Sequence, residues 1–158
     1  MDDHIEKLKE MVGKCRVGML GVNEEGRMHF GPMSHVDIDD QGNIWFFISS
    51  ESEKAKNIKK DNAVYLTYVH EAGSTFLTIE GIGHINTNKA KMRELFNPFI
   101  NAWFPKGLDD RTLALLVVHP VEVEYWISES KVLTQNKMLT PDLPKRSIAQ
   151  ESHGNLRV

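Results

Sequence analysis

Two serines and a lysine near the middle of the chain form the pattern best suited to bind an anion. Ser50 and Ser52 follow an apolar run, and Lys54 comes next, at the start of a lysine-rich segment of helical character. Ser50 with Glu53 fits the S/T-x-x-E capping box, and Ser52 is an alternative N-cap. Free backbone N–H groups, the positive end of the helix dipole and an ammonium group would then converge on one position. Many capped surface helices carry lysines and bind nothing, so this hypothesis needs support from the rest of the chain.

The composition excludes several classes of protein. The chain has 158 residues, of which 41% are hydrophobic and 26% charged, which is typical of one soluble globular domain. A formal net charge of −3 provides no basic excess for binding a nucleic-acid backbone. No apolar run reaches transmembrane length, and the acidic N-terminus does not resemble a signal peptide. We therefore expect a cytoplasmic protein that binds neither nucleic acid nor membrane.

Alternating apolar residues and glycine-containing turns predict a mainly β fold with peripheral helices. Helical spacing is found at 3–13, at 54–60 and after Asn88. Extended segments are expected at 15–22, 27–38, 44–48, 63–69, 74–86 and 113–127. Six strands with glycine-rich bends favour a closed or nearly closed antiparallel β-barrel. We expect this domain to span residues 1–128 and a loose polar tail to span 129–158.

The histidines and glycines do not form a recognised catalytic or metal-binding motif. No pair of histidines has H-E-x-x-H spacing, and Cys15 is the single cysteine, so we predict no metal site. A spatial cluster of His29, His35 and His84 remains an alternative, since these residues fall on or near predicted strands. Hydrolase, kinase and Rossmann motifs are missing from the sequence.

Three segments of the sequence resemble one protein family. Residues 46–58 are similar to the F-F-T-x-x-x-S-x-K-x-x-x-L signature of pyridoxamine 5′-phosphate oxidases and their relatives, and residues 31–34 resemble the R-P-M-S/T segment. Residues 103–126 are similar to the W-F-P-x-G-x-D-D…L-x-L-L…W pattern of the general stress protein 26 subfamily. The resemblance implies an FMN-binding split barrel of six antiparallel strands, and it covers about residues 5–127.

The resemblance also implies a homodimer that holds FMN in a groove between two barrels. Ser52 and Lys54 would bind the phosphate, and Trp103 would come from the partner subunit. The remaining residues that would line the isoalloxazine and ribityl side are Met33, Ser34, Phe47, Ile48 and Ser49. An alternative role for Trp103 is that of a core aromatic beside Phe99 and Phe104.

Three positions depart from the family pattern around the expected phosphate. Gly31 stands where relatives often have arginine, Ile48 stands where the signature has threonine, and Glu53 adds a carboxylate. Each loss of a charged hydrogen bond would cost about 1.5–3 kcal/mol, so the site would bind FMN more weakly or would bind a different flavin-like ligand.

The leading functional hypothesis is therefore an FMN-binding, oxidoreductase-like protein of the general stress type. The true oxidases have a carboxy-terminal arginine and histidine motif without a counterpart here, so we do not expect pyridoxamine 5′-phosphate oxidation. No residue of the sequence is nominated as a general acid or base, and the electron donor and acceptor stay unknown. The alternatives are a flavin-binding or storage protein without turnover, and a split barrel that binds haem or no cofactor.

Overall fold

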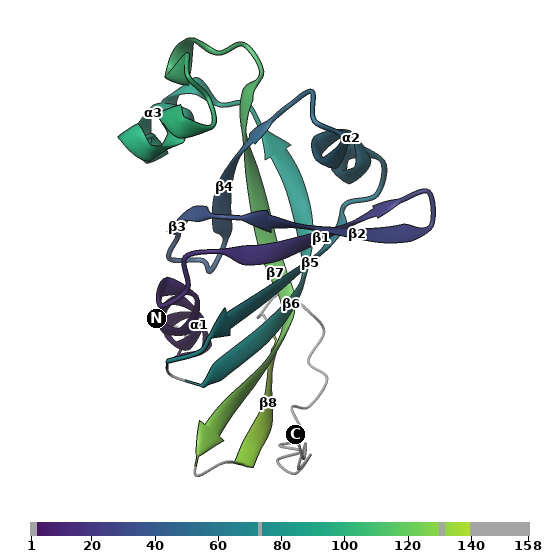
Figure 1. Ribbon diagram of the computed structural model, residues 1–158, viewed down its shortest axis with the longest axis vertical. Helices are drawn as coiled ribbons and strands as arrows, with labels where there is room; N and C mark the ends of the chain where they lie inside the picture. Colours follow the sequence, from purple (N-terminus) through teal and green to yellow (C-terminus); the bar gives the residue numbers. More distant parts are fainter. Residues whose placement is uncertain (1–2, 73, 130–131, 140–158) are drawn as a thin grey trace.

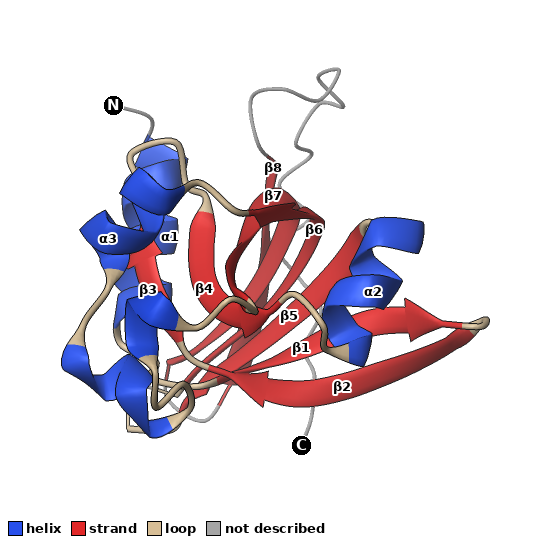
Figure 2. Ribbon diagram, turned by 90° about the horizontal axis from the view of Figure 1, so that it is seen from above, coloured by secondary structure: helices blue, strands red, loops and turns tan. Residues whose placement is uncertain are grey.

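The computed structural model describes residues 3–72, 74–129 and 132–139, which form one curled antiparallel sheet with helices around it (Figures 1 and 2). The helices are α1 (Asp3–Gly13), α2 (Glu53–Lys60) and α3 (Lys89–Leu95), with two 3₁₀ turns, η1 (Pro98–Ala102) and η2 (Gly107–Asp109). The strands are β1 (Gly18–Glu24), β2 (Arg27–Met33), β3 (His35–Ile38), β4 (Ile44–Ser49), β5 (Ala63–His70), β6 (Thr75–Asn86), β7 (Leu113–Glu129) and β8 (Val132–Leu139). Within the described ranges, the helices are too short or too polar to cross a membrane.

The order of the strands explains how the sheet closes. Hydrogen bonding follows the path β2-β1-β5-β6-β7-β4-β3, and β8 adds to β7. The two end strands of this path, β2 and β3, are consecutive in the chain and are separated only by Ser34. One continuous segment therefore pairs with β1 before Ser34 and with β4 after it. The chain itself joins the two ends of the sheet, and the predicted antiparallel barrel with peripheral helices is confirmed.

The strand count differs from the prediction for two reasons. The sequence predicts one extended segment over 27–38, whereas the structure divides it at Ser34 into β2 and β3, which have different pairing partners. Residues Val132–Leu139, expected in a loose tail, instead form β8, which pairs antiparallel with the end of β7. The sheet thus continues past residue 128, while the expectation for 140–158 lies outside the described residues. The domain boundary itself stays a prediction.

A single apolar core fills the inside of the curled sheet. The inward-facing residues of alternate strand positions are almost completely buried, among them Leu20, Phe46, Leu66, Ile79 and Leu116. Two helices complete this core, because α1 contributes Leu8, Met11 and Val12, and α2 contributes Ala55 and Ile58. Cys15, which follows α1, is 5% exposed, and burial raises the pKa of its thiol.

A second, smaller core lies on the outer face of β4 and β7. Trp45 and Phe47 point outward from β4, opposite in direction to their buried neighbours Ile44, Phe46 and Ile48, as the two-residue period of a strand requires. They pack with Met92 of α3, Ile100 of η1 and Leu113 and Leu115 of β7. The function of α3 and η1 in the fold is therefore to cover this face of the sheet.

A bulge accommodates the proline in the longest strand. Glu80 of β6 pairs with Glu122 of β7, but the next residue, Gly81, pairs with Pro120, so Val121 is left over. Glycine and proline are typical of such irregularities in strands, and here Gly81 and Pro120 lie at the shift of register.

The close packing of Tyr68 against β1 generates a prediction for stability. A Cβ atom on Gly18 would lie 2.6 Å from Cε1 of Tyr68, whose side chain is 1% exposed and has no space to move away. Gly18→Ala is therefore expected to lower the free energy of unfolding by about 1–3 kcal/mol, as overpacked core substitutions do. Gly13→Ala is the matched control, since nothing lies within 4 Å of its added Cβ. Urea unfolding of both variants measures the difference, and equal stability of the two would contradict the packing argument.

Candidate anion and cofactor site

The junction between β4 and α2 is held by hydrogen bonds of Ser49 and Ser52. The Ser52 side chain caps α2 by accepting a hydrogen bond from the Ala55 N–H at 3.1 Å. The same hydroxyl donates to the Ser49 carbonyl oxygen at 2.7 Å, and the Ser49 hydroxyl accepts from the Glu51 N–H at 3.3 Å. The Ser52 hydroxyl proton is thus used within the fold. An anion would accept it only if the hydrogen bond to the Ser49 carbonyl were broken.

The structure selects one of the two caps that the sequence allows. The alternative N-cap, Ser52, is the one that forms, and the capping box of Ser50 and Glu53 is wrong. The reason lies in the sheet, because the Ser50 N–H donates to the Thr112 carbonyl at 2.7 Å and so prolongs the pairing of β4 with β7. The chain can turn into the helix only after that bond.

The first turn of α2 presents backbone donors that its own cap does not use. The N–H groups of Ala55 and Lys56 bond to the side chain and the carbonyl of Ser52, respectively. In the described part of the chain, the N–H groups of Glu53 and Lys54 have no acceptor. Donors of this kind at the positive end of a helix dipole are suited to bind a phosphate or another anion.

Lys54 reaches from this helix turn across β2. Its Nζ lies 2.8 Å from the position that a Cβ atom on Gly31 would occupy, so the ammonium group lies directly over the glycine backbone. The side chain is half-buried, and burial lowers the pKa of Lys54. No ion pair of Lys54 exists among the described residues, and no neighbouring charge contributes to its pKa shift. A partly desolvated cation without a counter-ion favours the binding of an anion at this position.

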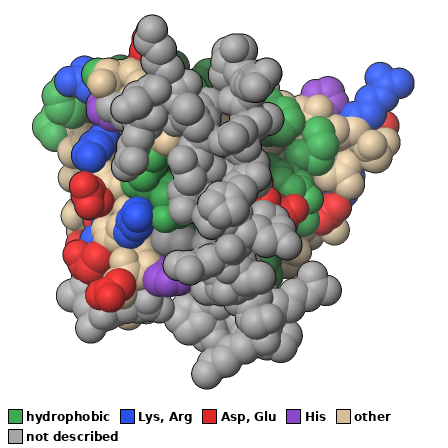
Figure 3. Space-filling view, turned by 90° about the horizontal axis from the view of Figure 1, so that it is seen from below, with side chains coloured by type: hydrophobic (Ala, Val, Ile, Leu, Met, Phe, Trp, Pro, Cys, Tyr) green, Lys and Arg blue, Asp and Glu red, His purple; other side chains and the backbone are tan. Residues whose placement is uncertain are grey.

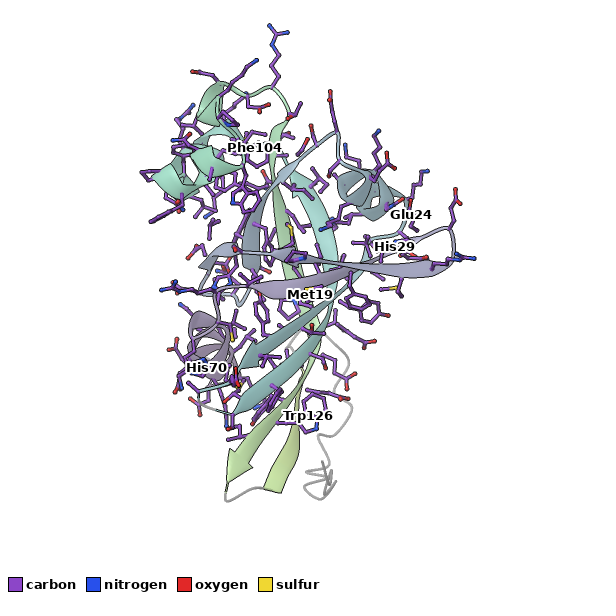
Figure 4. All side chains as sticks on the ribbon, viewed as in Figure 1. Met19, Glu24, His29, His70, Phe104 and Trp126 are labelled. Carbon is purple, nitrogen blue, oxygen red and sulfur yellow. The ribbon has the colours of Figure 1, made fainter. Side chains whose placement is uncertain are left out.

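The charged neighbours of this position are already paired. Glu53, which the sequence places beside the phosphate, forms an exposed ion pair with Lys56 at 3.6 Å. Glu24 of β1 lies 3.3 Å from His29 of β2, and Figure 4 shows both on the side of the β1–β2 hairpin toward α2. The pairing of Glu24 with His29 was missed in the sequence, where nothing marks two residues on opposite arms of a hairpin as partners.

The segment around Ser34 joins this position to the end of β2. Gly31 and Met33 share one face of β2, because they pair with Leu20 and Gly18 of β1. Met33 is partly buried and packs on the inner core, whereas Ser34 is exposed at the corner between β2 and β3. The structure therefore brings the Met33–Ser34 segment and Lys54 to one region of the surface, as the site hypothesis requires.

The side chains of Phe47 and Ile48 are placed away from this surface. Phe47 is 8% exposed in the outer core, with its ring edge-on to Phe96 at a centroid distance of 6.4 Å. Ile48 is 5% exposed in the inner core. Of the three predicted residues at the end of β4, only Ser49 has a partly exposed side chain. A ligand at this edge would meet the main chain of Phe47 and Ile48 rather than their side chains.

Trp103 is the C-cap of η1, which packs with Phe47 on the outer face of β4, whereas Lys54 lies on α2. Trp103 is 80% exposed, so its alternative role as a core aromatic is excluded. Figures 1 and 2 both show α3, which precedes η1, on the opposite side of β4 from α2. An exposed tryptophan in this position is available to a second chain.

The histidines do not form a metal centre in the part of the chain that the structure describes. No group of three or more His, Cys, Asp or Glu residues there could hold a metal ion. His29 pairs with Glu24, and His84 is exposed on β6. His35 lies edge-on to Phe46 and Tyr68, and burial, opposed by the charge of Asp37, lowers its pKa. His29, His35 and His84 therefore have different surroundings and do not form a cluster.

Comparison with known proteins gives one family. The sequence profile of the family described as pyridoxamine 5′-phosphate oxidase like matches residues 3–148. Among curated proteins, protein bli-3 of Neurospora crassa is 22% identical over 98 residues, which are 57% of this chain and 47% of the relative. The match thus spans about half the length of that relative.

Solved structures of the same fold support this result. A protein related to general stress protein 26, of the pyridoxinephosphate oxidase family, from Clostridium acetobutylicum has a TM-score of 0.73 and 20% identity, over 88% of this chain and 96% of that chain. The general stress FMN/FAD binding protein of Xanthomonas citri has a TM-score of 0.68 and 28% identity, over 79% of this chain and 92% of that chain. The subfamily resemblance seen in the sequence motifs is confirmed.

The hydrogen bonds at the start of α2 predict opposite effects for two neighbouring substitutions. Ser52→Ala removes the cap and is expected to lower the free energy of unfolding by about 1 kcal/mol. Lys54→Met removes an unpaired, partly buried cation and keeps the length of the side chain, so the stability of the protein without ligand is expected to stay equal or to rise. Urea unfolding in a buffer without phosphate measures both. A loss of stability in Lys54→Met as large as in Ser52→Ala would show that Lys54 is a structural residue.

Proposed function

The chain belongs to the pyridoxamine 5′-phosphate oxidase-like family, and we propose that it binds a flavin, FMN, with the phosphate at Lys54. The observation that carries this proposal is the unpaired ammonium of Lys54, placed over Gly31 beside the free N–H groups of α2. In a family with FMN/FAD-binding members, such a position is suited to a flavin phosphate. Met33, Ser34, Ser49 and the main chain of Phe47 and Ile48 would then line the remainder of the cofactor.

The residues fit a flavin better than they fit haem. Haem iron needs an axial ligand such as histidine. Among the described histidines, the His35 ring packs against two aromatic rings at the inner core, His29 lies beside Glu24, and Nδ1 of His119 lies 2.7 Å from Oδ1 of Asn43. The Lys54 position, by contrast, offers a cation and backbone donors, which suit a phosphate.

The bound flavin would supply electron transfer, and the protein would bind and orient it. Lys54 would neutralise phosphate charge, Ser49 would offer its partly exposed hydroxyl, and Gly31 would allow the phosphate and Lys54 to approach the backbone of β2. These roles do not require a general acid or base from the protein. They hold for an oxidoreductase of the general stress type and equally for a flavin-storage protein, and reduction of the bound flavin by NAD(P)H would distinguish the two.

We also propose that the site is completed by a second copy of the chain. Exposed apolar residues gather on the outer face of β1 and β2, where Met19 is 40%, Met28 44% and Phe30 51% exposed. Figure 3 shows hydrophobic side chains on the side of the molecule from which this hairpin projects. Contiguous apolar surface of this kind is typical of an interface between proteins. In the dimer, Trp103 of one subunit would cover the flavin bound at Lys54 of the other.

The lysines of α2 provide a test of the phosphate position. Lys54→Ala is expected to weaken FMN binding by about tenfold or more, which corresponds to the ~1.5–3 kcal/mol of a charge-assisted contact. Lys59→Ala and Lys60→Ala are matched controls, since these exposed residues lie in the last turn of the same helix. Fluorescence titration of the apoprotein at moderate salt measures all three. Riboflavin, which has no phosphate, should bind the wild type and Lys54→Ala about equally.

Long-range attraction alone would act about equally on the three lysines, and salt screens it beyond about 10 Å. Equal small losses of FMN affinity in the three variants would therefore contradict a direct contact at Lys54. If the wild type bound neither FMN nor riboflavin, the flavin-binding function itself would be wrong.

The dimer predicts complementation between two damaged chains. Lys54→Ala and Trp103→Ala are each expected to weaken FMN binding, the second through loss of an aromatic contact worth about 0.5–1.5 kcal/mol beyond buried area. A mixed dimer of the two variants would contain one site with both native residues and one site with neither. Half of its sites should therefore recover the affinity of the wild type.

The measurement is FMN titration of a mixed dimer isolated by two different affinity tags. If Trp103 acted on the site of its own chain, no site in the mixed dimer would recover. A wild type that stays monomeric in sedimentation equilibrium at micromolar concentration would contradict the dimer as well.

A further inference from the structure

Gly31 and Lys54 together determine how much positive charge the proposed phosphate position contains. Among the described residues beyond its chain neighbours, the only heavy atoms within 4 Å of the Cβ position of Gly31 are Nζ and Cε of Lys54, at 2.8 and 3.6 Å. The lysine therefore occupies the space into which a side chain at residue 31 would project. A longer, charged residue at 31 would place a second cation there, and glycine does not.

Lys54 has no ion-pair partner in the described part of the chain. The lowering of its pKa has burial as its cause, with no contribution from another charged residue. On α2 and the hairpin, Glu53 pairs with Lys56, and Glu24 lies 3.3 Å from His29, which carries a charge only when protonated. Lys54 is thus the side-chain cation at this position, and the N–H groups at the start of α2 add uncharged donors.

We infer that the site selects a phosphate with one negative charge, as in a flavin dinucleotide or singly protonated FMN, over the FMN dianion. This inference rests on the proposed flavin-binding function and specifies its ligand. The attraction between a phosphate and one ammonium grows in proportion to the phosphate charge, whereas the cost of removing the phosphate from water grows with the square of that charge. In a partly desolvated position with one cation, the second negative charge therefore costs more than it gains.

The experiment compares FMN with flavin adenine dinucleotide at two pH values. A phosphomonoester loses its second proton near pH 6, so FMN changes from mainly monoanion at about pH 5.5 to dianion at about pH 8. Each phosphate of the dinucleotide keeps one charge across this range. The Kd of FMN, divided by the Kd of the dinucleotide, is expected to rise about five- to tenfold from the lower to the higher pH.

The ratio of the two constants cancels the part of the pH dependence that protein groups impose equally on both flavins. The other titratable groups on the elements around Lys54 are Glu53, Lys56, Lys59 and Lys60 of α2, Glu24 of β1, Arg27 and His29 of β2, and Glu80 and His84 of β6. Their charges act on both flavins. His29→Asn tests the one histidine on the same strand as Gly31, and it should leave the change of the ratio with pH intact.

Gly31→Arg and Gly31→Gln provide a matched pair of variants. Both add a long side chain that only the flexible end of Lys54 opposes, but arginine alone adds a cation with a fork suited to a phosphate dianion. Gly31→Arg should bind FMN at about pH 8 roughly tenfold more tightly relative to the dinucleotide than Gly31→Gln does. If either variant fails to fold, the two pH values still test the wild type.

A wild-type ratio that is constant or falls with rising pH would overturn the inference and leave flavin binding in place. A ratio whose pH dependence disappears in His29→Asn would assign the selection to His29 and would overturn it too. If FMN, the dinucleotide and riboflavin all failed to bind, the proposed function would be wrong, and the inference with it.

Discussion

The closure of the sheet by a single chain segment is the constraint on which the site depends. β2 and β3 are the two ends of the hydrogen-bonded path, yet only Ser34 separates them. The corner at Ser34 must therefore lie where the sheet would otherwise be open. The segment before this corner includes Gly31 and Met33, and the strand paired with the segment after it, β4, leads into α2. The same closure that encloses the inner core thus brings the start of α2 to β2.

The charge on Lys54 lowers the stability of the fold, and it has no ion-pair partner among the described residues. Within the described residues, the lysines that form ion pairs have a carboxylate at 3.0–3.6 Å, and they are Lys9, Lys14, Lys56 and Lys91. Lys54 is more buried than a typical surface lysine, and that burial disfavours its charged form. A group that lowers stability without a compensating contact is characteristic of a binding site, because the missing partner is the ligand. This is the physical reason for the proposal that Lys54 acts in binding rather than in folding.

Much of the fold follows from local sequence patterns. Strand periodicity, the glycine-containing turns and the Asn88 cap of α3 are properties of neighbouring residues, and all agree with the structure. The division of 27–38 at Ser34 could not be predicted, because each half is extended and only the pairing partner changes. β8 was not predicted, because residues 132–139 have no strand-like alternation and form a strand through their pairing with β7.

The sequence motif located the candidate site, but it did not predict how the residues of the site are arranged in space. The serine–lysine pattern located the start of α2, although Ser52 rather than Ser50 is its cap. That Lys54 lies over Gly31 depends on a contact between residues distant in sequence, so Gly31 could be noticed only as a departure from the family pattern. The exposure of Trp103 likewise depends on which face of η1 packs on the outer core. The aromatic residues near Trp103 in the sequence do not predict which of them is buried.

The two-residue period of β4 explains why isoleucine is tolerated at residue 48, where the family signature has threonine. Ile48 replaces a threonine of the signature, and in sequence this reads as the loss of a polar contact to the phosphate. The structure places the Ile48 side chain in the inner core, 5% exposed, while Phe47 points to the outer core. A side chain at residue 48 therefore faces the apolar interior of this barrel, where isoleucine adds buried apolar area. The replacement contributes to stability and leaves the main chain of β4 free to contact a ligand. The weakening that the sequence suggests is then confined to Gly31, where the missing arginine leaves Lys54 as the cation of the site.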